Sequence, residues 1–206
     1  MTAAAAFPPA LTLADRLVGS RSAVTDAGLV LGGVAVVGAL AQVEVPLWPV
    51  PISGQTLGVM VVGASLGARR AAAAMTAYLL LGLAGLPIFA GGTGGPMSVA
   101  KPSFGFVIGF IFAAAFVGWL AERRWDRHRW LSLLGFLGAS IIPFLVGVPY
   151  MGVILGRMGL PNDAATLLSL GVTPFILGGV VKWLIAASLM PLAWRAVREL
   201  DRRAGR

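Results

Sequence analysis

The chain has 206 residues, of which 58% are hydrophobic and only 12% are charged, and its mean hydropathy is +0.88. Soluble domains carry about 25% charged residues, so this composition excludes an ordinary water-soluble domain and indicates an all-α integral membrane protein. The net charge of +8 does not indicate nucleic acid, because the basic residues lie in short clusters between hydrophobic runs, which is typical of a topology signal.

The first 23 residues precede the hydrophobic runs and contain no pattern of a cleaved signal peptide, since a basic n-region and a small-residue cleavage site are missing. Ala10, Leu13, Ala14, Leu17 and Val18 recur at helical spacing. This spacing indicates a short interfacial helix. A frayed terminus is the alternative, and the sequence leaves both open.

Six runs without charge, or with a single charge, follow in chain order and are the predicted membrane spans. The runs are Ala27–Val43, Ile52–Ala68, Ala71–Ala90, Ser103–Ala121, Leu131–Leu155 and Gly171–Trp194. A crossing needs about 17–25 apolar residues, so the first two runs are near the lower limit. We therefore expect one integral membrane domain over residues 1–206, with a compact six-helix bundle over 27–194 and a basic tail over 195–206.

The basic residues predict the orientation of these spans. If the connections are taken alternately, one set, together with the two ends of the chain, contains almost all of the basic residues. They are Arg16, Arg21, Arg69, Arg70, Arg123, Arg124, Arg127, Arg129, Arg195, Arg198, Arg202, Arg203 and Arg206. The opposite set has only Lys101 and Arg157. Because cytoplasmic connections are enriched in Lys and Arg, this asymmetry predicts a multi-pass protein of a bacterial-type cytoplasmic membrane with both termini inside.

The predicted external connections have an unusual composition. The first reads "EVPLWPVPISGQ" and the second "FAGGTGGPMSVAKPS". Proline fixes the backbone and glycine permits close approach, so such loops can fold back over a cavity. Ordinary tight surface turns are the alternative, and composition alone does not decide between the two.

The motifs of energy conversion and catalysis are missing from the sequence. No G-x-x-x-x-G-K-[ST] phosphate loop is present, and every acidic residue lies at the end of a span or in a connection. The carboxylates that proton- or sodium-coupled carriers place inside their spans are therefore absent. With no cysteine and one histidine, His128, we expect no metal site and no cofactor. The pattern favours a binding protein over an enzyme.

Lys182 lies in the middle of the last span, where a lysine costs roughly 2.5–3.5 kcal/mol on insertion scales. An intramembrane lysine normally faces the protein interior and finds a partner, so we expect a functional role. Gln55 begins the second span and offers both donors and acceptors. Four aromatic residues near the outer ends of the spans either wall an apolar pocket or form an interfacial belt. They are Phe89, Phe104, Phe106 and Tyr150.

Small residues at helical spacing predict close helix contacts. Gly105, Gly109 and Ala113 form one such set, and Ala35 and Ala39 form another. Spacing alone favours packing inside the chain over contact with another protein.

Several segments together resemble the BioY family, the biotin-specific substrate-binding subunits of energy-coupling-factor (ECF) transporters. They read "VPLWPVPISGQTLGVMVVGASLGARR", "YLLLGLAGLPIFAGGTGG", "KPSFGFVIGF", "GVPY" and "TPFILGGVVK". The resemblance covers the chain from about Ala27 to Trp194, in order and without large gaps. It implies a six-helix subunit that captures biotin outside with high affinity. It also implies that a transmembrane coupling protein and two ATPases are its partners, although some members work without the dedicated ATPases.

The resemblance assigns roles to particular positions. The family pattern G-D-x-x-K places Lys182 at a ligand contact and puts Gly179 where the family has aspartate. Without that acceptor, Gln55 or loop carbonyls would have to receive the ligand N–H groups, or Lys182 would pair with the ligand carboxylate instead.

The family segment Thr-Gly-Gly-(Tyr or Arg) corresponds to Ser103, Phe104, Gly105 and Phe106, and Phe106 lacks a hydrogen-bond donor. Tyr150 stands where the family has tryptophan. The glycine-rich loop of the family is matched by Gly91, Gly92, Gly94 and Gly95. Ala35 and Ala39 match the small-residue motif that contacts the coupling protein.

The sequence thus predicts a biotin-binding transport subunit in the lipid bilayer, with a pocket formed by both external loops, Tyr150 and the last helix. Two alternatives stay open. One is a subunit for a different vitamin, which Gly179 and Phe106 would suit. The other is a small self-sufficient carrier or an assembly subunit. Whether the chain forms a homo-oligomer is also left open.

Overall fold

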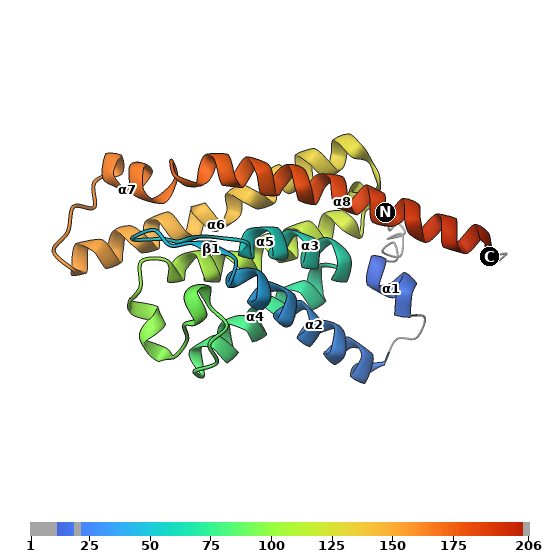
Figure 1. Cartoon of the computed structure of the whole chain (residues 1–206), viewed down its shortest axis with the longest axis horizontal. Helices are drawn as coiled ribbons and strands as arrows, with labels where there is room; N and C mark the ends of the chain where they lie inside the picture. The colour runs from blue at the N-terminus through green and yellow to red at the C-terminus, as the bar shows by residue number, and fades with distance from the viewer. Residues whose placement is uncertain (1–11, 19–21, 204–206) are drawn as a thin grey trace, which may run out of the picture.

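The computed structural model describes residues 12–18 and 22–203, and this part of the chain is mostly helical (Figure 1). Its eight α-helices are α1 (Leu13–Val18), α2 (Ala23–Ala41), α3 (Gln55–Leu66), α4 (Ala68–Leu83), α5 (Phe104–Ala121), α6 (Arg129–Arg157), α7 (Ala164–Gly171) and α8 (Phe175–Arg203). The shorter elements are β1 (Glu44–Val45), β2 (Ile52–Ser53) and the 3₁₀-helices η1 (Ala90–Gly92), η2 (Pro96–Ala100) and η3 (Trp125–Arg127).

Each of the six predicted spans contains a helix, but the helices differ in length. Within the described part, α2, α5, α6 and α8 are long and apolar enough to cross a membrane. By contrast, α3 has 12 residues and α4 has 16. The second predicted span was too long because Ile52 and Ser53 pair in a strand and the chain turns at Gly67, whose φ is +83°. That left-handed conformation suits glycine and separates α3 from α4.

The sequence did not predict the short elements in the connections, among them a hairpin and α7. The proline-rich first connection forms a small antiparallel hairpin, in which Glu44 pairs with Ser53 and Val45 with Ile52. The connection before the last span contains α7, whose first turn is capped by Asp163, which accepts hydrogen bonds from the backbone N–H groups of Ala165 and Thr166. Such a cap satisfies donors that the helix start would leave free.

Of the two alternatives for the N-terminal segment, the structure has a helix, α1, over four of the five residues at helical spacing. Ala10 is among residues 1–11, which with 19–21 lie outside the described part of the chain. Thr12 accepts a hydrogen bond from the backbone N–H of Asp15, and the Asp15 carboxylate accepts one from Thr12 in return. This reciprocal arrangement is a capping box. At the other end, α8 runs through Arg203, so residues 195–203 of the predicted basic tail continue the last helix.

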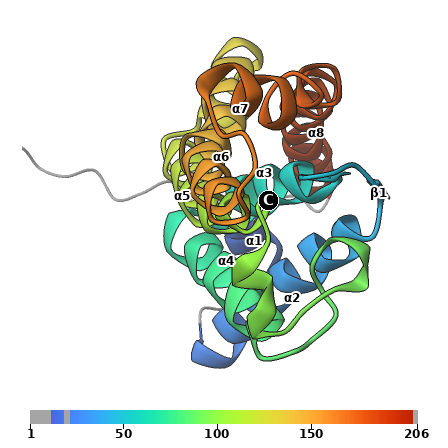
Figure 2. The same cartoon turned by 90° about the vertical axis from the view of Figure 1, so that its left-hand side faces the viewer.

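Helix α5 is the centre of the bundle, with 67% of its apolar window buried, compared with 22% in α2 and in α8. Small residues on α5 allow its neighbours to pack this closely against it. A Cβ added at Gly109 would lie 2.7 Å from the Cα of Pro143 in α6, so the predicted packing of Gly105, Gly109 and Ala113 inside the chain is confirmed. Figure 2 shows α3 between α8 above and α2 below. The outer faces of α2 and α8 are left with exposed leucine and valine side chains.

Candidate functional site

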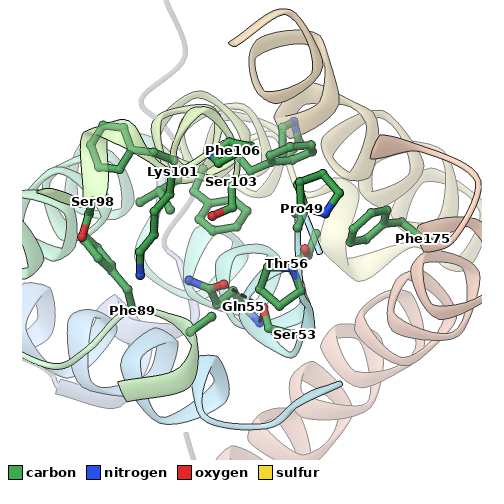
Figure 3. Close-up of a pocket in the computed structure, with 18 of the residues that line it drawn as sticks. Pro49, Ser53, Gln55, Thr56, Phe89, Ser98, Lys101, Ser103, Phe106 and Phe175 are labelled. Carbon is green, nitrogen blue, oxygen red and sulfur yellow. Dashed lines mark hydrogen bonds between the residues drawn. The ribbon is translucent and has the colours of Figure 1, made fainter. Parts of the chain in front are cut away.

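A cavity of about 330 Å³ lies where the two predicted external connections meet the helices. Its volume falls in the range of small-molecule sites, roughly 300–1,000 Å³. The hairpin loop contributes Trp48, Pro49, Val50 and Pro51, and the second connection contributes residues from Phe89 to Ser103. Residues from α3, α5, α6 and α8 complete the walls (Figure 3). Of the two alternatives that the composition of these loops left open, the structure shows the one in which both loops line a cavity.

Lys182 reaches this cavity from the second turn of α8, and its ammonium donates a 2.9 Å hydrogen bond to the backbone carbonyl of Ser53. That carbonyl belongs to β2, so the hairpin and the last helix meet at the lysine. The single bond leaves two of the three ammonium donors available to a ligand.

A chain of hydrogen bonds continues from the hairpin across the bundle. The Ser53 hydroxyl donates to the side-chain oxygen of Gln55 at 2.7 Å. The Gln55 amide nitrogen donates to the Tyr78 hydroxyl at 2.7 Å, and that hydroxyl donates to the Ile88 carbonyl at 2.8 Å. Gln55 is 6% exposed and Tyr78 is fully buried. Because buried polar groups must be paired, this chain fixes the orientation of the Gln55 amide in the cavity wall.

Aromatic rings form the apolar walls of the cavity. Phe89 and Phe104 meet edge to face, with centroids 6.4 Å apart, and Phe106 stacks on Phe175 at 6.3 Å. Phe144 contacts both Phe106 and Phe175. Such rings offer flat faces to a ring-shaped ligand and exclude water from it.

The structure thus brings together five of the nine predicted substrate-binding residues, namely Lys182, Gln55, Phe89, Phe104 and Phe106. Tyr150 lies behind this wall, with its ring 6.0 Å from that of Phe104 and its hydroxyl donating to the Val99 carbonyl. Gly179 lines a neighbouring cavity of about 300 Å³ between α6 and α8, which shares Lys182 with the first.

Gly91 and Gly92 form a turn beside the cavity. Their φ angles are +70° and +63°, which favour glycine. The Gln42 side chain holds this turn from the end of α2, accepting from the Gly92 N–H at 2.9 Å and donating to the Phe89 carbonyl at 3.2 Å. The turn therefore positions Phe89 in the cavity wall.

Sequence reasoning missed Tyr78, Ser98 and Lys101 as residues of the site. A tyrosine in the middle of an apolar run was a usable signal for Tyr78, since a buried hydroxyl needs a partner. Lys101 was counted only as an external charge. Within the described part of the chain, the cavity lining includes two lysines and no Asp or Glu, and no group of three or more His, Cys, Asp or Glu side chains could hold a metal ion.

Comparisons with known proteins agree on one family. The model of the BioY family matches residues 12–199. The biotin transporter BioY of Rhizobium etli is 35% identical over 163 residues, covering 76% of this chain and 84% of that protein. The biotin transporter BioY of Thermotoga maritima is 32% identical, covering 71% and 82%.

A solved structure has the same fold. The crystal structure of the S-component for biotin from an ECF-type ABC transporter aligns with a TM-score of 0.63 at 23% identity, covering 85% of this chain and 95% of that one. With a family model that spans nearly all of the described residues, and with relatives aligned over most of their length, this chain belongs to the BioY family.

Proposed function

We propose that this chain is the biotin-binding S component of an ECF-type vitamin transporter, which captures biotin outside the cell and delivers it inward. The observation that supports this most is Lys182, a lysine of an apolar helix whose ammonium lies at an aromatic-walled cavity of ligand size. A buried cation is retained when a ligand or strong acceptor meets it. The family and its biotin-transporting relatives point to the same ligand.

The cavity suits the chemistry of biotin. The fused rings of biotin are compact and largely apolar, and they match the aromatic wall that Phe106 and Phe175 form. The ureido carbonyl is a strong acceptor, and we assign it to the Lys182 ammonium. The ureido N–H groups need acceptors, and the oxygens of Ser53, Gln55 and Thr56 lie in the same wall. These residues replace the acceptor that Gly179 lacks.

The proposed topology has six crossings with both termini inside. The distribution of charge supports this topology. In Figure 1, the arginine-rich connections and the end of α8 lie toward one end of the molecule, and the hairpin and α7 lie toward the other. With the positive-inside rule, this distribution supports a cavity that opens to the outside. The short α3 and α4 would cross only together with the chain that flanks them.

The proposed partners are a transmembrane coupling protein and two ATPases, because the chain has no phosphate-binding loop of its own. Support comes from α2, where Ala35 and Ala39 are exposed on the outside of the bundle. Gly28 and Gly32 are exposed on the same helical face, with open space where a Cβ would be. A face of small residues lets another helix approach closely.

The test is equilibrium binding of biotin to the detergent-purified protein, with Lys182→Ala and Lys182→Met beside the wild type. We expect tight binding by the wild type and a loss of at least about tenfold in both variants, since a hydrogen bond to a charged group contributes roughly 1.5–3 kcal/mol. Lys182→Met keeps the length of the side chain and so separates charge from packing.

Other results would change the assignment. Unchanged affinity in both variants would keep biotin as the ligand and make Lys182 a structural residue. A folded wild type that ignores biotin would contradict the proposal, and a panel with thiamine and riboflavin would then test another vitamin, as Gly179 and Phe106 allow.

A further inference from the structure

The second lysine of the cavity, Lys101, differs from Lys182 in its surroundings. Lys101 is exposed, lines the cavity and has no hydrogen bond or ion pair from its ammonium to any residue that the structure describes. Lys182 is half-buried and already bonded to the Ser53 carbonyl. A cavity with two cations and no anion among its described lining residues is electrostatically suited to a ligand with a negative group.

Ser98 is the second unusual residue on the same side of the cavity. Its side chain is 2% exposed, yet its hydroxyl has no hydrogen-bond partner among the described residues. A buried hydroxyl without a partner costs free energy, so such groups are expected to meet a ligand or water. Ser98 also lines the cavity, so a ligand in the cavity would lie next to this residue.

The backbone brings these two donors together. Ser98 lies in η2, and Lys101 caps the end of η2 with a 3.0 Å hydrogen bond from its N–H to the Ser98 carbonyl. In a 3₁₀-helix, residues three apart in sequence lie one above the other. In Figure 3, Ser98, Lys101 and Phe89 are drawn on one side of the pocket, with Phe175 on the other, and the Lys101 side chain extends into the pocket toward Gln55.

We infer that Ser98 and Lys101 form a carboxylate subsite at the mouth of the cavity, which binds the acid group of the ligand while Lys182 binds its other polar end. This inference rests on the proposed function. A carboxylate would accept from the Ser98 hydroxyl and from the Lys101 ammonium, a charge-assisted pair of bonds. Placing the anion at the exposed lysine also costs less desolvation than placing it at Lys182.

The subsite supplies donors that another wall of the cavity lacks. The Phe106 ring has no hydrogen-bond donor, so this wall of the cavity contributes only apolar contact. Ser98 lies in the preceding η2 and Lys101 directly follows it, so both supply donors from there. The ligand would then lie with its acid group under the second connection.

The test compares biotin with biotin methyl ester, which keeps the rings but lacks the negative charge. Affinities for both are measured by calorimetry on wild type, Lys101→Met, Ser98→Ala and Lys182→Met. Arg157→Ala is the matched control, because Arg157 is the other basic residue of the predicted external connections and does not line the cavity.

We expect the wild type to prefer the acid over the ester by about tenfold or more. Lys101→Met should abolish most of this preference by weakening acid binding alone, Ser98→Ala should reduce it, and Arg157→Ala should preserve it. Lys182→Met should weaken acid and ester alike. Preference that survives Lys101→Met, or that disappears only in Lys182→Met, would overturn the subsite. A wild type that binds neither compound would instead overturn the proposed function.

Discussion

At the scale of single residues, the site depends on polar groups that are paired before a ligand arrives. Lys182, Ser53, Gln55 and Tyr78 are joined by successive hydrogen bonds of 2.7–2.9 Å. Tyr78 is the inner end of this chain and does not line the cavity. It therefore acts by holding the Gln55 amide, which a ligand would meet directly.

This role predicts the effect of Tyr78→Phe. The change leaves the Gln55 amide and the Ile88 carbonyl without their partner inside the bundle, so we expect a loss of about 1–3 kcal/mol in unfolding free energy. Biotin affinity should fall by a few-fold as Gln55 becomes free to rotate. Thermal unfolding and calorimetry on the purified protein measure both effects. Tyr150→Phe is the control, because it removes a hydroxyl at an exposed bond to Val99; an equal loss there would argue against a special role for Tyr78.

At this scale, the sequence indicates Lys182 but not the partners of Gln55. An isolated charge in an apolar run is visible without a structure, so a functional role was predicted for Lys182, and the resemblance to BioY proteins made it a ligand contact. Lys182 does line a cavity. The partners of Gln55 were not predictable, because Tyr78 is 23 residues away and its position depends on the packing of α4 on α3. Ser98 and Lys101 were missed because the 3₁₀ conformation of η2 aligns them, and proline and glycine in a loop do not specify that conformation.

At the scale of elements, the helices were predictable because their apolar runs are long. Contacts between single side chains of different elements were not predictable from these runs. The connection η3 shows how such contacts attach one element to another. The Trp194 indole N–H of α8 donates to the Asp126 carboxylate, and the Arg127 guanidinium lies 3.8 Å from the centre of the Trp194 ring. Asp126 is 3% exposed, and burial raises its pKa above the ordinary value.

This raised pKa predicts a pH-dependent effect of Asp126→Asn. The folded protein binds the Asp126 proton more tightly than the unfolded chain, so the wild type loses stability as the pH rises above about 4, the pKa of an unfolded aspartate. Asparagine still accepts from Trp194 but has no charge to bury. We therefore expect the stability of Asp126→Asn relative to the wild type to increase between pH 4 and pH 7 in thermal unfolding.

Asp163→Asn is the control of opposite sign. The side-chain and backbone hydrogen bonds of Thr166 to Asp163 lower the pKa of this exposed carboxylate at the start of α7. Its contribution is therefore present above the unfolded pKa and is lost as the pH falls, so the relative stability of Asp163→Asn should decrease with rising pH. Parallel behaviour of the two variants would contradict the assignment of the Asp126 effect to burial.

At the scale of the whole molecule, the two sets of connections lie toward opposite ends of the long axis (Figure 1). In Figure 1, the hairpin and α7 lie at the end opposite to α1 and the C-terminal part of α8. The second connection, with its cavity residues, is drawn in green toward the hairpin end. If the arginine-rich end faces the cytoplasm, as proposed, the end with the hairpin faces the outside, where it could receive a ligand.

The absence of cysteine from the sequence makes this orientation directly testable. Single cysteines are introduced as Met97→Cys, in the second connection, and Arg129→Cys, at the start of α6; both wild-type side chains are exposed. If both termini are inside, a membrane-impermeant maleimide should label position 97 in intact cells and position 129 only after permeabilisation. The unmodified chain is the control and should not react. The reverse labelling would invert the topology, and labelling of both positions in intact cells would place η2 and the start of α6 on the same side. The reverse labelling would also remove the proposed outward opening of the cavity, because Lys101 and Ser98 lie within a few residues of position 97. Labelling of both positions in intact cells would keep that opening and contradict only the predicted number of crossings between them.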